Sequence, residues 1–133
     1  MAKRKSIHAS SAPEVIGPYS HAVRVGNLLF LAGQIALDPK TMDLVDGGFR
    51  DEVKQVFKNV EAVLKAADCT LDDVVKLTVY LTDLSNFEQV NAIMSEKFSS
   101  PFPARAAVGV AALPRGASIE LDVIADMRHV VAI

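Results

Sequence analysis

The clearest alternation of apolar and polar positions lies near the C-terminal end of the chain. Residues 104–110 and 118–123 each alternate as strands with one buried face do, and a Leu-Pro-Arg-Gly turn at 113–116 lies between them. The pattern predicts an antiparallel hairpin, because the apolar face stays together only if Val108 pairs near Leu121.

The predicted register gathers charged and small side chains on the polar face of this hairpin. Arg105 and the position facing Glu120 are four residues apart, roughly 13 Å along a strand, which is too far for a direct ion pair. Ala107 and Gly109 lie between them, so the face can hold a small anion. A solvated sheet face whose charges are unrelated is the alternative interpretation.

Apolar spacing predicts the remaining elements. The Gly26-Asn27 pair predicts a tight hairpin whose second strand is apolar nearly throughout and is expected to be covered on both faces. A helix with one apolar stripe is predicted over 51–67, and a capping box at 85–88 opens a second helix that runs to about residue 98. The predicted strands are 6–9, 21–25, 28–34, 74–82, 104–110 and 118–123.

The element order is βββαβαββ, which predicts a single α+β domain over residues 1–133 with a six-stranded mixed sheet. Two amphipathic helices can cover only one face of such a sheet. We therefore expect the other face to be buried against copies of the same chain around a closed rotation axis.

Composition narrows the functional classes. A net charge of −2 and a sequence pI of about 5.9 argue against an extended nucleic-acid interface. No apolar run follows the basic start, and none approaches the roughly 20 residues that span a membrane, so neither a signal peptide nor membrane insertion is predicted. Cys69 is the only cysteine, which favours the cytoplasm, and the spacing of the three histidines indicates no metal site.

Several short motifs occur in an order and at a spacing that resemble one family. They are Gly17-Pro18-Tyr19-Ser20, Ala32-Gly33-Gln34-Ile35, Asn59, Val75-Lys76-Leu77-Thr78-Val79, Phe87-Glu88-Gln89-Val90-Asn91, Pro103-Ala104-Arg105 and Ile119-Glu120-Leu121-Asp122. The chain resembles the RidA family (also YjgF or L-PSP) of small imine deaminases over residues 7–125. The resemblance implies a chorismate-mutase-like subunit, and a homotrimer whose sheets form a central barrel with active sites in clefts between subunits.

The resemblance also implies an activity. Better-characterised members hydrolyse 2-iminopropanoate and 2-iminobutanoate to 2-oxo acids and ammonia, with no cofactor or metal. By position, the catalytic residues are Arg105, which can grip the substrate carboxylate with two parallel hydrogen bonds, and Glu120, which can accept a proton from the attacking water. The implied substrate-binding residues are Tyr19, Gly33, Asn91, Arg105 and Ala107, with Gly33 and Ala107 acting through the backbone.

Each of these side chains also has a plain structural interpretation. Arg105 can form an interface salt bridge, and Glu120 can be an exposed strand acid. Tyr19 can simply wall the cleft, and Asn91 can make a hydrogen bond between helix and loop. His21 and His129 are expected to be structural or exposed.

Three other functions stay open at this stage. A single-strand endoribonuclease or translation inhibitor needs basic grooves and stacking aromatics, whereas this chain has two tyrosines and no tryptophan. A small-molecule-binding, chaperone-like trimer would use the same cleft without turnover. A deaminase of another substrate, such as aminomuconate, would use the same chemistry.

Overall fold

The elements of the chain follow the predicted order βββαβαββ. The computed structural model describes residues 3–131. The strands are β1 (Lys5–Ile7), β2 (Ala22–Val25), β3 (Leu28–Gln34), β4 (Val74–Leu81), β5 (Ala104–Gly109) and β6 (Ile119–Asp126), and the helices are α1 (Phe49–Ala66) and α2 (Phe87–Lys97). Short 3₁₀ turns lie at Leu71–Asp73, Leu84–Asn86 and Pro114–Gly116.

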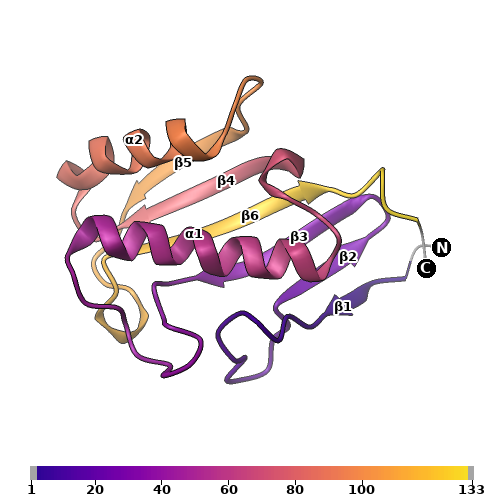
Figure 1. The fold of residues 1–133 in the computed structure, drawn as a ribbon, viewed down its shortest axis with the longest axis horizontal. Helices are drawn as coiled ribbons and strands as arrows, with labels where there is room; N and C mark the ends of the chain where they lie inside the picture. Colours follow the sequence, from indigo (N-terminus) through magenta and orange to yellow (C-terminus); the bar gives the residue numbers. More distant parts are fainter. Residues whose placement is uncertain (1–2, 132–133) are drawn as a thin grey trace.

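The six strands form one mixed sheet, as predicted. Their order is β1-β2-β3-β6-β4-β5, with β4 and β5 parallel and every other neighbouring pair antiparallel. The Gly26-Asn27 hairpin is confirmed, since Val25 pairs with Leu28 across it. Figure 1 shows α1 lying across the sheet and α2 beside β5.

The predicted hairpin of the last two strands is wrong. Strand β4 lies between them, and its Leu77 pairs with Arg105 on one side and Val123 on the other. The chain reaches β5 through a β4–α2–β5 crossover, which produces a parallel pair. Alternation specifies which residues share a face of a strand, but it does not specify the neighbouring strand.

One face of the sheet and the apolar stripe of α1 make the core. Fully buried side chains from both layers pack there, and they are Leu29, Leu77, Leu81, Ile119 and Leu121 from the sheet and Val53, Val56, Phe57, Val60 and Leu64 from α1. Both helices therefore pack on the same side, as predicted. None of the described helices is long and apolar enough to cross a membrane.

The opposite face of the sheet exposes large apolar side chains. Leu28 and Phe30 are each 43% exposed, and Val25 and Val108 are exposed to a similar extent. The expectation that residues 28–34 are covered on both faces is therefore wrong for the single chain. Val25, Leu28 and Phe30 lie together on β2 and β3, while Val108 lies on β5 at the far edge of the sheet, and a second protein surface can cover this face.

The capping box predicted at 85–88 is not formed. Asn86, which precedes α2, makes no side-chain capping bond. Instead Asp83 accepts hydrogen bonds from the backbone N–H of Ser85 at 2.9 Å and from its hydroxyl at 2.7 Å. The Asp83 carboxylate thus caps a 3₁₀ turn that leads directly into α2.

Candidate active site

A cavity of about 460 Å³ opens beside Glu120 of β6. Two other predicted site residues line it, Gly33 from the end of β3 and Tyr19 from the loop before β2. The rest of its wall is largely apolar and includes Ile16, Ile35, Leu37 and Met42. The charged residues of the wall are Glu14, Arg115 and Glu120, and a largely apolar cavity with a few charged groups is typical of a site that binds a small molecule in a defined orientation.

The buried imidazole of His21 holds the loop that carries Tyr19. Its Nδ1 accepts the backbone N–H of Ala9 at 3.1 Å, and its Nε2 lies 2.8 Å from the carbonyl oxygen of Pro13. Since Nδ1 accepts, the ring proton is assigned to Nε2, which donates to Pro13. His21 is therefore a structural residue. Tyr19 is half exposed, and its hydroxyl accepts the N–H of Ile16 at 3.4 Å.

Asn59 of α1 holds the other wall of the cavity. Its buried amide donates hydrogen bonds to the carbonyl oxygens of Ile35 at 3.0 Å and Leu37 at 2.8 Å, and its Oδ1 accepts from Gln55. A buried polar side chain with all its bonds made fixes the backbone that it contacts. The helix thereby positions the segment that follows β3.

The carboxylate of Glu120 has an unusual environment for a strand acid. Burial raises its pKa above the usual glutamate range, and the nearby carboxylate of Asp122 raises it further. Asp122 in turn accepts a hydrogen bond from the Tyr80 hydroxyl at 3.0 Å, which raises the pKa of Tyr80. Glu120 is therefore a more basic carboxylate than an exposed glutamate, as a proton acceptor needs to be.

Gly33 lies in a β-bulge, where the pairing of β3 with β6 shifts between Leu31 and Gln34. A Cβ atom built at Gly33 would collide with the carboxylate of Glu120, whose Cδ would lie only 2.9 Å away. The missing side chain therefore gives the carboxylate its room against the backbone.

If the family resemblance holds for this site, we expect the Gly33→Ala variant to keep its fold and to lose the implied imine deamination. The new methyl group meets the end of a flexible side chain, so Glu120 moves aside at little cost to stability. A displacement of about 1 Å in a reacting group can lower the rate roughly 100-fold. Steady-state kinetics with an imine substrate and thermal melting measure the two effects. In a Glu120→Gln background the same substitution should cost little, and an equal loss there would contradict this explanation.

Arg105 lies on the side of the sheet that faces the helices, against α2. Its guanidinium carbon is 4.5 Å from the ring centre of Phe87, and Nη1 donates to Oδ1 of Asn91 and lies 3.5 Å from Sδ of Met94. Three residues spaced about one turn apart along α2 thus contact the guanidinium. The side chain of Asn91 bonds to a strand, whereas its structural interpretation named a loop, and a role in ligand binding stays a prediction.

Ala107 is two residues further along β5, which is an edge strand. The N–H of Val110 bonds to the carbonyl oxygen of Leu81 in β4. Because successive N–H groups of a strand point to opposite sides, the N–H of Ala107, three positions earlier, points to the free edge of the sheet. Its backbone is thus oriented to bind a ligand or another chain beside Arg105.

The two predicted catalytic residues lie on opposite faces of the sheet. Arg105 is in register with Leu77 on the helix side, whereas Glu120 is in register with Tyr80 on the uncovered side. The prediction that they share a face is wrong, and the cause is the parallel pairing of β5 with β4. The predicted site residues of one chain thus fall into two separate groups, which we call half-sites. The Glu120 half-site comprises Tyr19, Gly33 and Glu120, and the Arg105 half-site comprises Asn91, Arg105 and Ala107.

Comparison with known proteins places the chain in a family. A family model described as Endoribonuclease L-PSP matches residues 9–127. The chain belongs to this family. The resemblance inferred from the ordered motifs is thereby confirmed.

Relatives of this L-PSP family member are similar over most of its length. The human protein named 2-iminobutanoate/2-iminopropanoate deaminase is 48% identical over 122 residues, which are 92% of this chain and 89% of that protein. A RutC family protein of Pyrococcus horikoshii is 46% identical and covers 92% and 97% of the two chains. The crystal structure of RidA from a Psychrobacter species matches with a TM-score of 0.88 at 46% identity, over 92% of this chain and 98% of that one.

Arg115 lies in the wall of the candidate site, although the sequence motifs did not identify it. It lines the cavity beside Glu120, and its Nη2 donates to the carbonyl oxygen of Met42 at 3.0 Å and lies 3.7 Å from Asp43. Its φ of 61° is rare for a residue with a side chain. One feature of the sequence could have indicated Arg115. It is a charged residue within the Pro-Arg-Gly turn just before the strand of Glu120, and that pattern was interpreted only as a turn.

Proposed function

We propose that this protein is a hydrolytic deaminase of 2-imino acids, acting on 2-iminopropanoate and 2-iminobutanoate in the cytoplasm without a cofactor. The observation that carries the proposal is the pair of half-sites. One offers a basic carboxylate in a cavity, and the other offers a guanidinium held for an anion. Relatives of 44–48% identity bear the name of this activity.

The active unit in this proposal is a homotrimer, in which the Glu120 half-site of one chain meets the Arg105 half-site of the next. Two features support it. The uncovered face of the sheet exposes Leu28, Phe30 and Val108, which a neighbouring chain would bury. Glu120 and Arg105 lie on opposite faces, so a site that uses both needs two chains related by rotation.

The chemistry follows from the two groups. The guanidinium of Arg105 binds the substrate carboxylate through two charge-assisted hydrogen bonds and fixes the position of the C=N carbon. Glu120 accepts a proton from a water as its oxygen bonds to that carbon. Glu120 returns this proton to the nitrogen, which gives a carbinolamine. The hydroxyl proton of the carbinolamine then passes through Glu120 to the nitrogen as the C=O bond forms, the C–N bond breaks, and ammonia and a 2-oxo acid leave. Each step uses only these side chains and water.

Mixing two inactive variants tests both the activity and the shared site. Glu120→Gln and Arg105→Ala are each expected to be nearly inactive in an assay that couples a threonine dehydratase to loss of the imine. The two variants are then unfolded and refolded together. An intact site forms only where an Arg105→Ala chain supplies Glu120 and the neighbouring Glu120→Gln chain supplies Arg105. Random assembly gives this with probability one half times one half, so about a quarter of the sites should recover in a closed trimer.

Light scattering provides the control for the mixing experiment. Each variant alone should assemble at three times the chain mass of 14.3 kDa. Absence of recovery from two correctly assembled variants would contradict the shared site. Wild-type protein without imine turnover would contradict the deaminase proposal itself.

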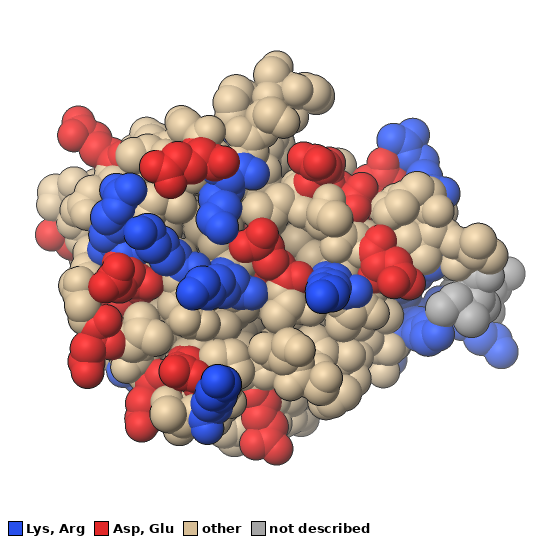
Figure 2. Space-filling model, viewed as in Figure 1, with Lys and Arg blue, Asp and Glu red and all other residues tan. Residues whose placement is uncertain are grey.

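The family description names an endoribonuclease, and the charges of this chain do not favour that activity. On the face drawn in Figure 2, Lys and Arg side chains are interleaved with Asp and Glu, and they form no continuous basic track there. The net charge is −2. A phosphate backbone binds where basic groups cluster, so we favour the small-molecule substrate.

A further inference from the structure

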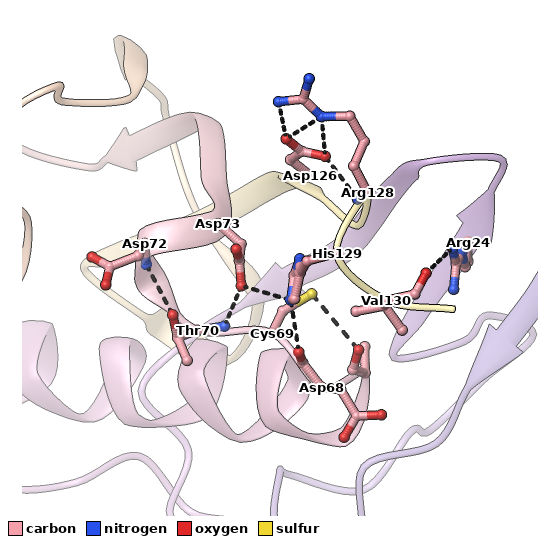
Figure 3. A network of polar contacts seen from close by, with 11 residues as sticks. Arg24, Asp68, Cys69, Thr70, Asp72, Asp73, Asp126, Arg128, His129 and Val130 are labelled. Carbon is pink, nitrogen blue, oxygen red and sulfur yellow. Dashed lines mark hydrogen bonds and ion pairs between the residues drawn. The ribbon is translucent and has the colours of Figure 1, made fainter. Parts of the chain in front are cut away.

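A mixed cluster of possible metal ligands lies at the other end of the sheet from Glu120. It brings together the thiol of Cys69, the carboxylate of Asp73 and the imidazole of His129 (Figure 3). One ligand atom from each lies within 4.8 Å of the others, and Nε2 of His129 is 3.6 Å from Oδ2 of Asp73. His129 is 60 positions from Cys69 in the chain, so its spacing gave no motif.

The end of α1 places Cys69. The N–H of Cys69 bonds to the carbonyl oxygen of Leu64, and the N–H of Asp68 bonds to that of Lys65. Asp68 has a left-handed φ of 60°. These features define a Schellman motif, which fixes the residue after the helix and turns its side chain inward.

A second local motif places Asp73. Its Oδ2 accepts the backbone N–H of Thr70 at 2.8 Å, while the Thr70 hydroxyl accepts the N–H of Asp72 at 3.2 Å, so the segment forms a capping box. Hydrogen bonds within the segment, from backbone to backbone at Cys69 and from backbone to side chain at Asp73, therefore hold both residues in place without a ligand.

The C-terminal segment brings His129 to these two residues. The N–H of Met127 bonds to Asn27 at 2.8 Å, and the N–H of Val130 bonds back to Met127 at 2.9 Å. Arg24, which is itself buried, donates to the carbonyl oxygens of Val130 at 3.0 Å and Val131 at 3.2 Å. His129 thus sits in an anchored turn, and its Nε2 also lies 3.1 Å from the carbonyl oxygen of Asp68.

Cys69 lacks the exposure and the lowered pKa that a reactive cysteine has. Cys69 is buried, and desolvation together with the charge of Asp73 raises the pKa of its thiol to about 11. A nucleophilic or redox cysteine has a lowered pKa and an exposed sulfur. The side chains of Asp73 and His129 are 23% and 51% exposed, so solvent reaches the cluster at these two residues.

We propose that Cys69, Asp73 and His129 bind a transition-metal dication of the Zn²⁺ class, with a solvent molecule as the fourth ligand. A sulfur, a nitrogen and an oxygen are the ligands that Zn²⁺ takes in tetrahedral sites. Bond lengths of about 2.0–2.3 Å place tetrahedral ligand atoms roughly 3.3–3.8 Å apart, so a pair of atoms in the cluster needs to approach by up to about 1.5 Å. On binding, the thiol releases its proton to solvent and becomes the anionic ligand.

The bound ion would join the C-terminal segment to the connection between α1 and β4. His129 lies beyond residue 127, where the match to the family model ends. Seven residues of extended chain separate Glu120 from Met127, a distance of ~24 Å. The site is therefore independent of the proposed deaminase chemistry.

Titration calorimetry of the untagged protein with Zn²⁺ tests the proposal. We expect one ion per chain, with the affinity reduced at least about 100-fold in Cys69→Ala and in His129→Ala, since even outer-shell partners of metal ligands cost 10–100-fold. Asp72→Asn is the matched control, because Asp72 is an exposed neighbour outside the cluster, and it should bind as the wild type does.

Co²⁺ provides a direct readout of the sulfur ligand. The wild-type complex should show a thiolate-to-cobalt charge-transfer band that Cys69→Ala lacks, and Zn²⁺ should raise the melting temperature of the wild type but not of His129→Ala. Because His129 is exposed, the His129→Ala variant should fold normally and keep the imine turnover of the wild type. Absence of binding, binding that survives both substitutions, or a Co²⁺ complex without the thiolate band would overturn the proposal.

Discussion

Replacing Glu120 by glutamine should lower imine deamination by ~10²–10⁴-fold, which is the usual contribution of a general base. Glutamine keeps the size of the side chain and its hydrogen-bonding shape but cannot accept the proton of the attacking water. Binding of 2-oxobutanoate, which needs Arg105 and the cavity, should persist. The dehydratase-coupled assay and calorimetry with 2-oxobutanoate measure the two quantities on the same protein.

Glu96→Gln is the matched control for this experiment. Glu96 is an exposed glutamate of α2 that pairs with Arg50 at 3.5 Å, away from both half-sites. We expect its activity to equal that of the wild type. Deamination at the wild-type rate by Glu120→Gln would show that Glu120 is an ordinary strand acid, as its plain structural interpretation holds.

The Arg105→Lys variant should bind 2-oxo acids more weakly by roughly 1.5–3 kcal/mol, the value of a hydrogen bond to a charged group. Lysine keeps the charge, can still lie over Phe87 and can still donate to Asn91. It lacks the planar fork that holds a carboxylate at two oxygens. Deamination should fall at least as far, because a carboxylate that pivots lets the C=N carbon drift from the water at Glu120.

Calorimetry with pyruvate or 2-oxobutanoate measures the loss, and light scattering measures the assembly. Arg50→Lys provides the control, since Arg50 is an exposed arginine whose contact is a surface ion pair. A folded trimer of Arg105→Lys with unchanged binding and turnover would show that Arg105 is not the anchor. Dissociation into single chains would show that Arg105 is mainly an interface residue.

The separation of the half-sites connects activity to assembly in this proposal. Neither half-site can perform the hydrolysis alone, because the base and the carboxylate anchor lie on opposite faces of the sheet. Dilution below the dissociation constant of the trimer should therefore remove activity before the chain unfolds. The exposed Leu28 and Phe30 give the association its hydrophobic driving force.

Much of the local structure follows from the sequence alone. The apolar stripe of α1, the Gly26-Asn27 hairpin and the element order were all predicted, because each depends on spacing within one short segment. The family was also accessible, since its motifs are ordered along the chain. Arg105 and Glu120 were singled out in the same way, by residue type and by position within those motifs.

Only the tertiary structure decides which of these segments meet. Insertion of β4 between β5 and β6 moves Arg105 and Glu120 to opposite faces, and no pattern within either strand specifies that neighbour. The grouping of Cys69, Asp73 and His129 likewise arises because the C-terminal segment docks beside the end of α1. Periodicity reports which side of an element is buried, whereas the partner of each surface depends on packing between residues far apart in the chain.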